Sequence, residues 1–497
     1  MSALKVAMNA GFNVVATIAD NHVVNRQFFK DFLCGGDLKP FAPNPLNRSL
    51  NLFILIDPTH TLKNLFNNFQ KSRGFVIPPG GSFGPYSPKF LHIRQLYELE
   101  SLKMLRMAHK LTTTCLQPTN IQRTSAKLTF SVFDESTASA MKYYSLHEQK
   151  QWVDTASFLQ DMSILFKIVN VKNSKVGFSK RDIYRQPILS PTDEKLQLLK
   201  DYADFFRTWK DSKSAGLTHE TFTACILMCE ALPSLARHLL DSGFNYVLLG
   251  HMQTDELEHR FGRYRQLCGA NYFISVKQLM ESEKKLKITS LLKHTMMSPL
   301  DLSTISEENS DSDTTMTTFA SEKFDFDGLK LDLDYSELEV LCFVSGYVAK
   351  SVLQKFSCES CLRLMVADED LPEVECDSHS HFFDIVNRGG LKKPSDSLFI
   401  LCCYAYSIFA HIKQSTNFSS FLTHNNPASL FCLTVTHVLE NFDRGDLVQL
   451  TCHSMHFLVN PILRCFFNIL AKNFVKNYNS QPNHSGRKIA KLQSHSA

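Results

Sequence analysis

The chain has 497 residues, of which 44% are hydrophobic and 21% are charged, so it is globular rather than disordered. A net charge of +4 permits nucleic-acid binding without requiring it. The 14 cysteines are too sparse for a disulfide scaffold, no signal peptide is evident, and the longest apolar run, Leu398 to Ala410, is too short for a membrane span. We therefore expect a soluble intracellular protein of about two to four domains.

The start of the chain has the pattern of short elements that end on acidic residues. Ser2 to Ala10 is typical of a helix, and the apolar segments Phe12 to Ala19 and Leu52 to Ile56 are typical of buried strands. The residue after each strand is an aspartate, Asp20 or Asp57. Because functional groups in open α/β sheets gather at the carboxyl ends of strands, these aspartates form the first candidate site.

The rest of the chain is expected to be mostly helical. Helical spacing recurs at 89–145, 154–171, 217–240, 255–268, 276–287, 340–354, 397–413, 428–440 and 454–472. One further short strand is expected at 246–250. The acidic, Ser- and Thr-rich segment 303–318 cannot bury a core, which predicts a disordered linker.

The segment after the second strand, Asp-Pro-Thr-His-Thr-Leu-Lys, contains a candidate cluster. A spacing of three places His60 and Lys63 on one helical face after Asp57, near a bound phosphate or a metal. The alternative is a helix-capping aspartate followed by a solvated face. The same alternative, a cap on the next helix, applies to Asp20.

A second acidic segment runs from Asp255 to Asn271. An apolar stripe that includes Leu257 and Phe261 predicts one buried face of a helix, and Asp255 and Glu258 share the opposite face. Like charges three residues apart repel unless a cation relieves them, so a divalent metal is one interpretation. A solvated amphipathic face is the other.

Taken in order, these segments resemble the P-element transposase family, including its vertebrate relatives that carry a THAP zinc finger. The matching residues are Asp20 with Asn25; Asp57-Pro58-Thr59-His60 with Lys63, Asn64 and Asn67; Gln253 to Arg265; and Ser345 to Ala349 before Cys358 and Cys361, followed by Arg388 to Leu391 and Pro394. The third segment is the most specific, although it departs from the family pattern at Gln253 and Thr254.

The resemblance implies an α/β fold, with an RNase H-like core that is incomplete at its N-terminus and is interrupted by an all-helical insertion. A mostly helical C-terminal domain follows. The implied divisions are the first part of the core at 1–80, a GTP-binding-like insertion at 81–218, the second part of the core at 219–295, the acidic linker at 296–334, the C-terminal domain at 335–476 and a basic tail at 477–497.

The resemblance also implies roles for individual residues. In the family, three acidic residues bind two Mg²⁺ ions that serve DNA cleavage and strand transfer. Asp20 and Glu258 match the second and third of them, and His60, Lys63 and Arg265 are candidates for DNA contact. The first acidic residue lies upstream in the family, whereas the 19 residues before Asp20 contain no Asp or Glu. We therefore expect that the printed chain does not cleave DNA.

Guanine-nucleotide binding is a family property of the insertion, with Asn170 and Asp255 as candidate contacts here. The segment from Leu165 to Asn170 resembles the family element F-F-D-x-x-N, but Lys167 replaces its acidic residue. A carboxylate accepts hydrogen bonds from guanine, whereas an ammonium group can only donate. We therefore expect little or no GTP binding. Phe66 likewise replaces an arginine and removes one phosphate contact.

Cys358 and Cys361 have the spacing of half a zinc site, which Cys376 with His379 or His381 could complete. The alternative is a pair of thiols at a helix end.

Three functions remain open at this point. The first is a nuclear, DNA-binding transposase derivative whose nuclease centre is incomplete. The second is a fragment of an active transposase, and the third is a domesticated, non-enzymatic interaction or regulatory protein. DNA is the expected partner, a second copy of the chain is a further candidate, and no membrane is expected. DNA binding should be weak, salt-sensitive and largely sequence-independent.

Overall fold

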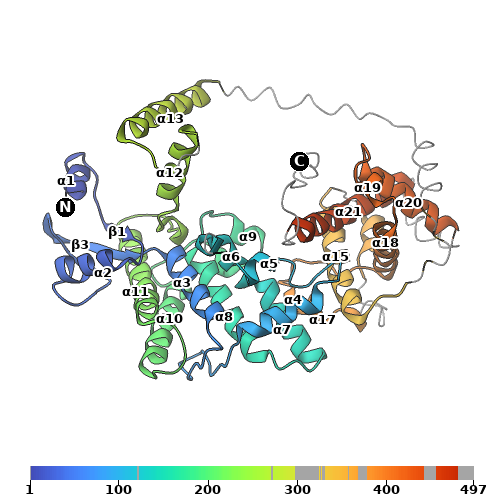
Figure 1. Ribbon diagram of the computed structural model, residues 1–497, viewed down its shortest axis with the longest axis horizontal. Helices are drawn as coiled ribbons and strands as arrows, with labels where there is room; N and C mark the ends of the chain where they lie inside the picture. The colour runs from blue at the N-terminus through green and yellow to red at the C-terminus, as the bar shows by residue number, and fades with distance from the viewer. Residues whose placement is uncertain are drawn as a thin grey trace.

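The computed structural model describes residues 2–119, 122–269, 273–296, 331–355, 358–367, 378–441 and 455–479, together with Phe324, Phe326 and Leu329. These residues form a mostly helical protein with one small mixed sheet (Figure 1). Among the described helices, none combines the length and apolar character that a bilayer crossing requires. The expected linker at 303–318 and most of the basic tail lie outside the described residues.

The sheet has three strands in the order β1-β3-β2. Strand β1 (Ala16–Ala19) pairs in parallel with β3 (Asn47–Ile56), and β2 (Phe41–Asn44) pairs antiparallel with β3. The predicted strand at 52–56 is confirmed, whereas only the second half of the segment 12–19 forms a strand, which is half-buried rather than buried. The sequence did not predict β2, because the proline in the short segment Phe-Ala-Pro-Asn disfavours a strand; proline is tolerated here because β2 lies at the sheet edge.

Short helices precede and connect these strands. They are α1 (Ser2–Asn9), α2 (Val23–Gln27) and the π-helical turn η1 (Phe28–Leu33). One face of the sheet packs on the long helix α11 (His219–Asp241). There, Ile54 and Ile56 form a small core with Ala224 and Leu227.

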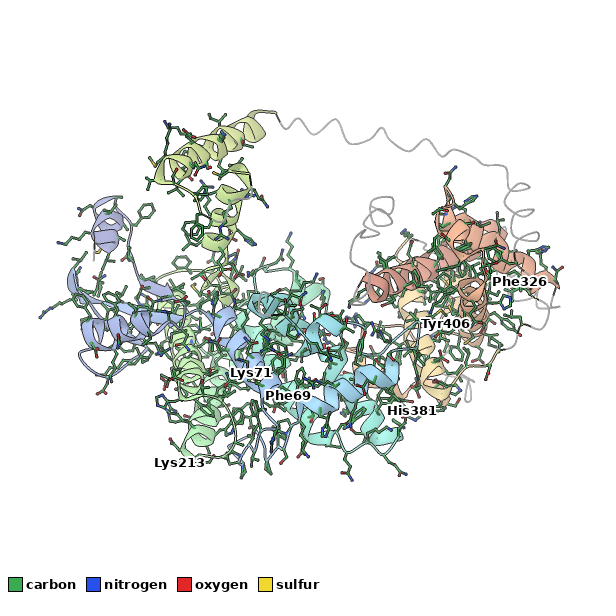
Figure 2. All side chains as sticks on the ribbon, viewed as in Figure 1. Phe69, Lys71, Lys213, Phe326, His381 and Tyr406 are labelled. Carbon is green, nitrogen blue, oxygen red and sulfur yellow. The ribbon has the colours of Figure 1, made fainter. Side chains whose placement is uncertain are left out.

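A block of helices from α3 (Pro58–Lys71) to α11 forms most of the interior, and it is called the helical block below. Between them lie α4 (Phe90–Glu100), α5 (Thr113–Leu116), η2 (Gln122–Thr124), α6 (Ala126–Val132), α7 (Glu135–His147), α8 (Val153–Val169), α9 (Val176–Ser179), η3 (Ile183–Arg185) and α10 (Glu194–Asp211). Phe69 is fully buried and packs its ring against Phe75, Phe90 and Phe158 at centroid distances of 5.0–5.6 Å (Figure 2). Aromatic packing of this kind holds the block together.

The prediction of a strand at 246–250 is wrong. Val247 forms only an isolated bridge with Ile188, and the 3₁₀ turn η4 (Leu249–His251) follows. Prolines at 187 and 191 flank the bridging residue, so the partner segment cannot donate a continuous ladder of hydrogen bonds.

Helices α12 (Asp255–Leu267) and α13 (Val276–Met296) form an arm that projects from the rest of the molecule (Figure 1). The helices are confirmed, but the expectation that the stripe on α12 is buried is wrong, because Leu257 and Phe261 are 57% and 41% exposed. In the described part of the chain α12 packs mainly on α13, through an Arg260–Glu283 ion pair at 2.6 Å, so its apolar face has no core to enter.

The C-terminal helices pack into a second compact unit, called the C-terminal domain below. They are α15 (Tyr335–Leu353), α16 (Glu359–Met365), α17 (His381–Val386), α18 (Asp396–Gln414), α19 (Phe418–Leu422), α20 (Pro427–Asn441) and α21 (Met455–Asn479). The four long helices are confirmed at their predicted places. Gly346 in α15 is required by close packing, because a Cβ there would lie 2.4 Å from the carbonyl oxygen of Lys392.

The helical block and the C-terminal domain are in direct contact. Helix α17 packs on α7, where the rings of Tyr143 and Phe382 meet edge to face at 6.3 Å. Lys103 of the block forms an ion pair at 3.0 Å with Asp334, which caps α15. The two units therefore form one packed body.

Candidate functional site

The two aspartates of the predicted site lie at one edge of the sheet. Ala19 is paired with Ile56 in the parallel β1–β3 register, so the next residues, Asp20 and Asp57, leave the sheet on the same side. The Asp57 backbone N–H donates to the Ala19 carbonyl at 2.8 Å. The exposed Asp20 carboxylate accepts a hydrogen bond from the side-chain amide of Asn25.

Asp57 is buried and fully engaged. One carboxylate oxygen accepts the His60 backbone N–H at 3.0 Å and so caps α3. The other accepts the Thr254 backbone N–H at 2.7 Å and the Thr254 hydroxyl. The capping interpretation of Asp57 is therefore confirmed, and this cap also fixes the start of the arm to α3.

His60 and Glu258 bring the two acidic segments of the sequence together. The His60 Nε2 lies 2.8 Å from a Glu258 carboxylate oxygen, although the two residues are 198 positions apart. The Lys63 ammonium lies 3.3 Å from the same imidazole nitrogen. Three of the predicted site residues thus meet above the sheet edge. Arg265 lies nearly two turns further along α12, and none of the described contacts joins Asp20 to Glu258.

A metal centre is not assembled by the described side chains, among which no three His, Cys, Asp or Glu residues gather closely enough to hold an ion. Cys358 precedes α16, Cys361 is buried in it, and Cys376 lies outside the described residues. His381 instead contacts the buried Glu339 carboxylate at 2.8 Å. Both the magnesium and the zinc sites stay predictions.

Gln253 and Thr254, the two positions that depart from the family pattern, connect the arm to the helical block. Gln253 accepts a hydrogen bond from Thr59 at 2.9 Å and donates to the Val169 carbonyl at 3.2 Å. Its amide also lies 3.4 Å from the side-chain oxygen of Asn170. The departures therefore carry structural roles that sequence reasoning missed, since their partners are distant in the chain.

The candidate nucleotide contacts lie beside a basic cavity. Asn170 lines a cavity of about 620 Å³ together with Lys127 and Lys172, and Lys172 forms an ion pair with Asp255. This space is called the Asn170 cavity below. Asp255 reaches it only through Lys172.

Lys167 is buried at the wall of the Asn170 cavity and is neutralised by acidic neighbours. Its ammonium lies 3.0 Å from Glu135 and 3.4 Å from Asp182. Burial lowers the pKa of Lys167, and Asp182 is the strongest opposing influence. Arg388 of the C-terminal domain contacts the same two carboxylates, at 3.0 Å for Asp182. We call these four residues the ion cluster. Sequence reasoning missed this cluster; a lysine inside an apolar helix is a signal that an acid lies near it, but does not tell which one.

Comparisons with known families match two parts of the chain. Residues 331–478 match the family described as DNA transposase THAP9, C-terminal domain, and residues 59–181 match the family described as TNP-like, GTP-binding insertion domain. This chain is a relative of the P-element and THAP9-type transposases. The two matched regions correspond to the C-terminal domain and to most of the helical block, and the predicted family resemblance is confirmed.

Among solved structures, the chain is similar to one titled "Drosophila P element transposase strand transfer complex". The sequence identity is 21% and the TM-score is 0.49, over 58% of this chain and 63% of that chain. The chain therefore spans less than two thirds of that P-element transposase. A comparison with curated proteins gave no match.

Proposed function

We propose that this protein is a P-element-like transposase derivative that binds DNA in the nucleus and carries an RNase H-like nuclease centre. The observation that supports the proposal best is the 2.8 Å contact between His60 and Glu258. It joins the two family-like motifs at the carboxyl edge of a parallel strand pair, which is where α/β proteins place their functional groups.

Asp20 and Glu258 are the carboxylates available to hold magnesium in such a centre. Their hard oxygen atoms suit Mg²⁺, which would stabilise the attacking and leaving oxygens of a strand displacement when bound. Asn25 orients Asp20, and His60 holds Glu258. Asp57 cannot take part, because its oxygens are committed to Thr254 and α3. These two carboxylates are fewer than the three that the family uses, so we propose that this chain does not cleave DNA.

Cleavage is tested by incubating the purified chain with transposon-end duplexes and Mg²⁺ or Mn²⁺. We expect no cleavage and no strand transfer. Metal-dependent cleavage that disappears in the Glu258→Ala variant would contradict the proposed inactivity and would identify an active nuclease.

DNA binding is proposed to use the surface around Lys63 and Arg265. Each lysine or arginine that contacts a phosphate contributes about one unit to the slope of log affinity against log salt. Fluorescence anisotropy with a labelled duplex should therefore show weak binding, with a shallower salt slope for the Lys63→Ala, Arg265→Ala double variant. Lys71→Ala, at the far end of α3, is the matched control and should leave the slope unchanged. A footprint on one defined short sequence would count against this mode.

The Asn170 cavity is proposed not to select guanine. The family has an acidic residue at the position of Lys167, which here is a lysine paired with Glu135 and Asp182 and cannot accept hydrogen bonds from guanine. GTP and ATP should then bind no differently through this cavity in calorimetry. A micromolar GTP affinity that is lost in Asn170→Ala would show that the argument from Lys167 is wrong.

A second candidate is a non-enzymatic interaction protein, and the exposed apolar face of the arm favours it. Leu257 and Phe261 are large, exposed and adjacent to the proposed DNA surface. Light scattering distinguishes self-association from a monomer: a dimer that dissociates in Phe261→Asp would identify the arm as a contact between copies. If the Phe261→Asp variant still bound DNA, the proposal of a DNA-binding transposase derivative would stand.

A further inference from the structure

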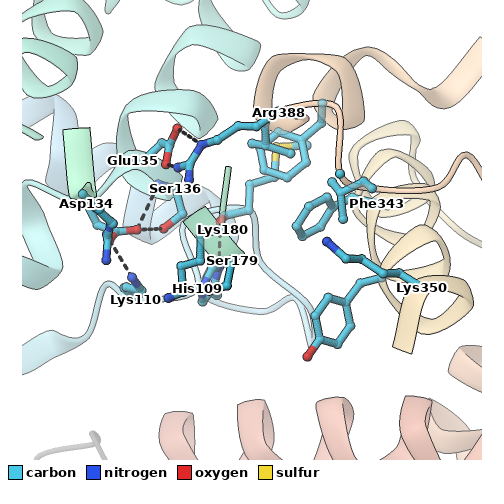
Figure 3. Close-up of a pocket in the computed structure, with 17 residues that line it drawn as sticks. His109, Lys110, Asp134, Glu135, Ser136, Ser179, Lys180, Phe343, Lys350 and Arg388 are labelled. Carbon is cyan, nitrogen blue, oxygen red and sulfur yellow. Dashed lines mark hydrogen bonds and ion pairs between the residues drawn. The ribbon is translucent and has the colours of Figure 1, made fainter. Parts of the chain in front are cut away.

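A cavity of about 380 Å³ lies at the junction between the helical block and the C-terminal domain, and it is called the junction cavity below (Figure 3). Lys110 and Asp134 line it from the block, and Lys350 enters from α15 on the opposite side. Gly390 leaves space for this lysine, since a Cβ there would lie 3.3 Å from the Lys350 ammonium. None of the candidate guanine contacts lines the junction cavity.

The lining carries more positive than negative charge. Its charged side chains are Lys110, Lys180, Arg185, Lys350 and Arg388 against Asp134 and Glu135. Two of the cations are neutralised by these acids: Lys110 lies 2.6 Å from Asp134, and Arg388 pairs with Glu135. Arg185 lies 3.2 Å from the neighbouring Asp182. Among the described residues, Lys180 and Lys350 have no ion-pair partner, so two lysines of the lining carry a charge that no acidic side chain neutralises.

The other half of the junction cavity is apolar and aromatic. Phe343, Tyr347 and Phe382 line it from the C-terminal domain. On the block side, the Ser136 and Ser179 hydroxyls already donate to Asp134 and to the Val176 carbonyl, so the ammonium groups are the donors that remain for a ligand. A cationic end next to an aromatic end suits a ligand with a phosphate and a ring. The volume is that of a small-molecule site rather than a nucleic-acid groove.

We propose that the junction cavity binds a small phosphorylated molecule, a nucleotide or an inorganic pyrophosphate, whose phosphate lies between Lys180 and Lys350. This site goes beyond the proposed function and does not depend on it. Because the two lysines belong to different units, a bound phosphate bridges the helical block and the C-terminal domain. The ligand therefore stabilises their association.

The test is isothermal titration calorimetry of the full chain with pyrophosphate, ATP and GTP, with four single variants. Lys350→Ala and Lys180→Ala should each weaken binding by about tenfold, because each removes one charged hydrogen bond. Lys127→Ala lies only in the Asn170 cavity, and Lys200→Ala lies on an exposed part of α10; both should bind as the unmodified chain does. Thermal unfolding confirms that each variant is folded.

The outcomes separate this site from its alternatives. Binding that is lost in Lys127→Ala but kept in Lys350→Ala would place the ligand in the Asn170 cavity and overturn the proposal. Absence of binding by all three compounds at millimolar concentration would also overturn it. If Lys350→Ala weakened the binding of a DNA oligonucleotide while none of the small molecules bound, the cavity would be a DNA contact instead. A rise in melting temperature with pyrophosphate that Lys350→Ala abolishes would support the bridge.

Discussion

The helical block and the arm are both built from amphipathic helices, yet they bury their apolar faces very differently. In α3 of the block, Phe69 is completely buried among four other phenylalanine rings. In α12 of the arm, Phe261 is 41% exposed and contacts the ring of Tyr264 on its own helix. Periodicity therefore predicts where a helix forms, whereas burial depends on what the rest of the chain places against it.

This contrast predicts the largest effect for truncation of a core phenylalanine. Phe69→Ala should lower the free energy of unfolding of the block by about 3–5 kcal/mol, because it leaves a cavity among rigid aromatic neighbours. Phe261→Ala is the matched control in the arm and should change it by less than about 0.5 kcal/mol. Urea unfolding followed by tryptophan fluorescence is suitable, since both tryptophans, Trp152 and Trp209, lie in the block. Equal costs for the two variants would remove the distinction between the regions.

Two buried titratable groups make the stability of the block depend on pH in opposite directions. Burial raises the pKa of Glu100 to about 7, so its contribution is complete below its unfolded value near 4.5 and is lost as pH rises through 7. Burial lowers the pKa of His109 to about 4, so its contribution is present above its unfolded value near 6.5 and is lost as pH falls through 4. The two effects oppose each other between about pH 4 and 7.

Single variants should separate these effects. In His109→Gln, Glu100 remains and stability should rise by as much as roughly 3 kcal/mol on acidification from pH 7 to 4.5. In Glu100→Gln, His109 remains and opposes the smaller gain from Asp161, whose pKa burial raises to about 6, so stability should not rise over this window. The measurement is urea unfolding at half-unit pH steps. Parallel pH profiles for the two variants would contradict the assignment, and Phe261→Ala should keep the profile of the unmodified chain.

The ion cluster connects the block to the C-terminal domain, so its loss should have an intermediate effect. Arg388→Ala leaves Glu135 and Asp182 with Lys167 as their shared cation and should cost about 1–2 kcal/mol, reduced from the value for a fully buried pair because Arg388 is partly exposed. Arg388→Lys retains the charge but cannot contact both carboxylates and should recover part of the loss. The loss of stability in each variant is measured by differential scanning calorimetry. No difference between alanine and lysine would mean that bidentate contact contributes nothing.

The smallest effect is expected where the arm joins the block. Thr254→Val removes the hydroxyl donor to Asp57 but keeps the backbone N–H bond. The loss of about 1 kcal/mol should loosen the arm locally and leave the core unchanged. Trypsin cleavage at the arginines of α12 should then be about fivefold faster, with unaltered tryptophan fluorescence. Thr289→Val, whose hydroxyl bonds only within α13, is the control; equal acceleration there would contradict the role of Thr254.

Local features of the fold were predictable from sequence, and long-range pairings were not. Apolar runs and spacing located β3, part of β1 and most of the long helices, but not α10, and Asp57 was recognisable as a cap. Strand β2 was missed because it contains a proline, which disfavours a strand except at the edge of a sheet, and the sequence does not show which strand lies at the edge. The exposed face of α12 was misjudged because no sequence pattern reveals whether a partner surface exists.

The candidate site shows the same limit. His60, Lys63 and Glu258 were chosen through the family resemblance and meet in the structure. The contact between Arg388 and Glu135 spans 253 positions and could not be inferred from either segment. Buried charge demands a partner, but only the folded chain determines which residue supplies it.

The segment between α3 and α11 begins and ends at one place. The Val76 backbone N–H donates to the Ala215 carbonyl at 2.8 Å, and Asn68 of α3 accepts the Thr218 N–H at the start of α11 at 2.9 Å. The intervening residues form a loop whose two ends are held together at this base. The packing there offsets the entropy that is lost when the loop closes. Insertions in an exposed loop between residues 77 and 214 should therefore be tolerated, because they leave this base unchanged. The intervening segment is thus topologically a pendant that is held at its base by α3 and α11.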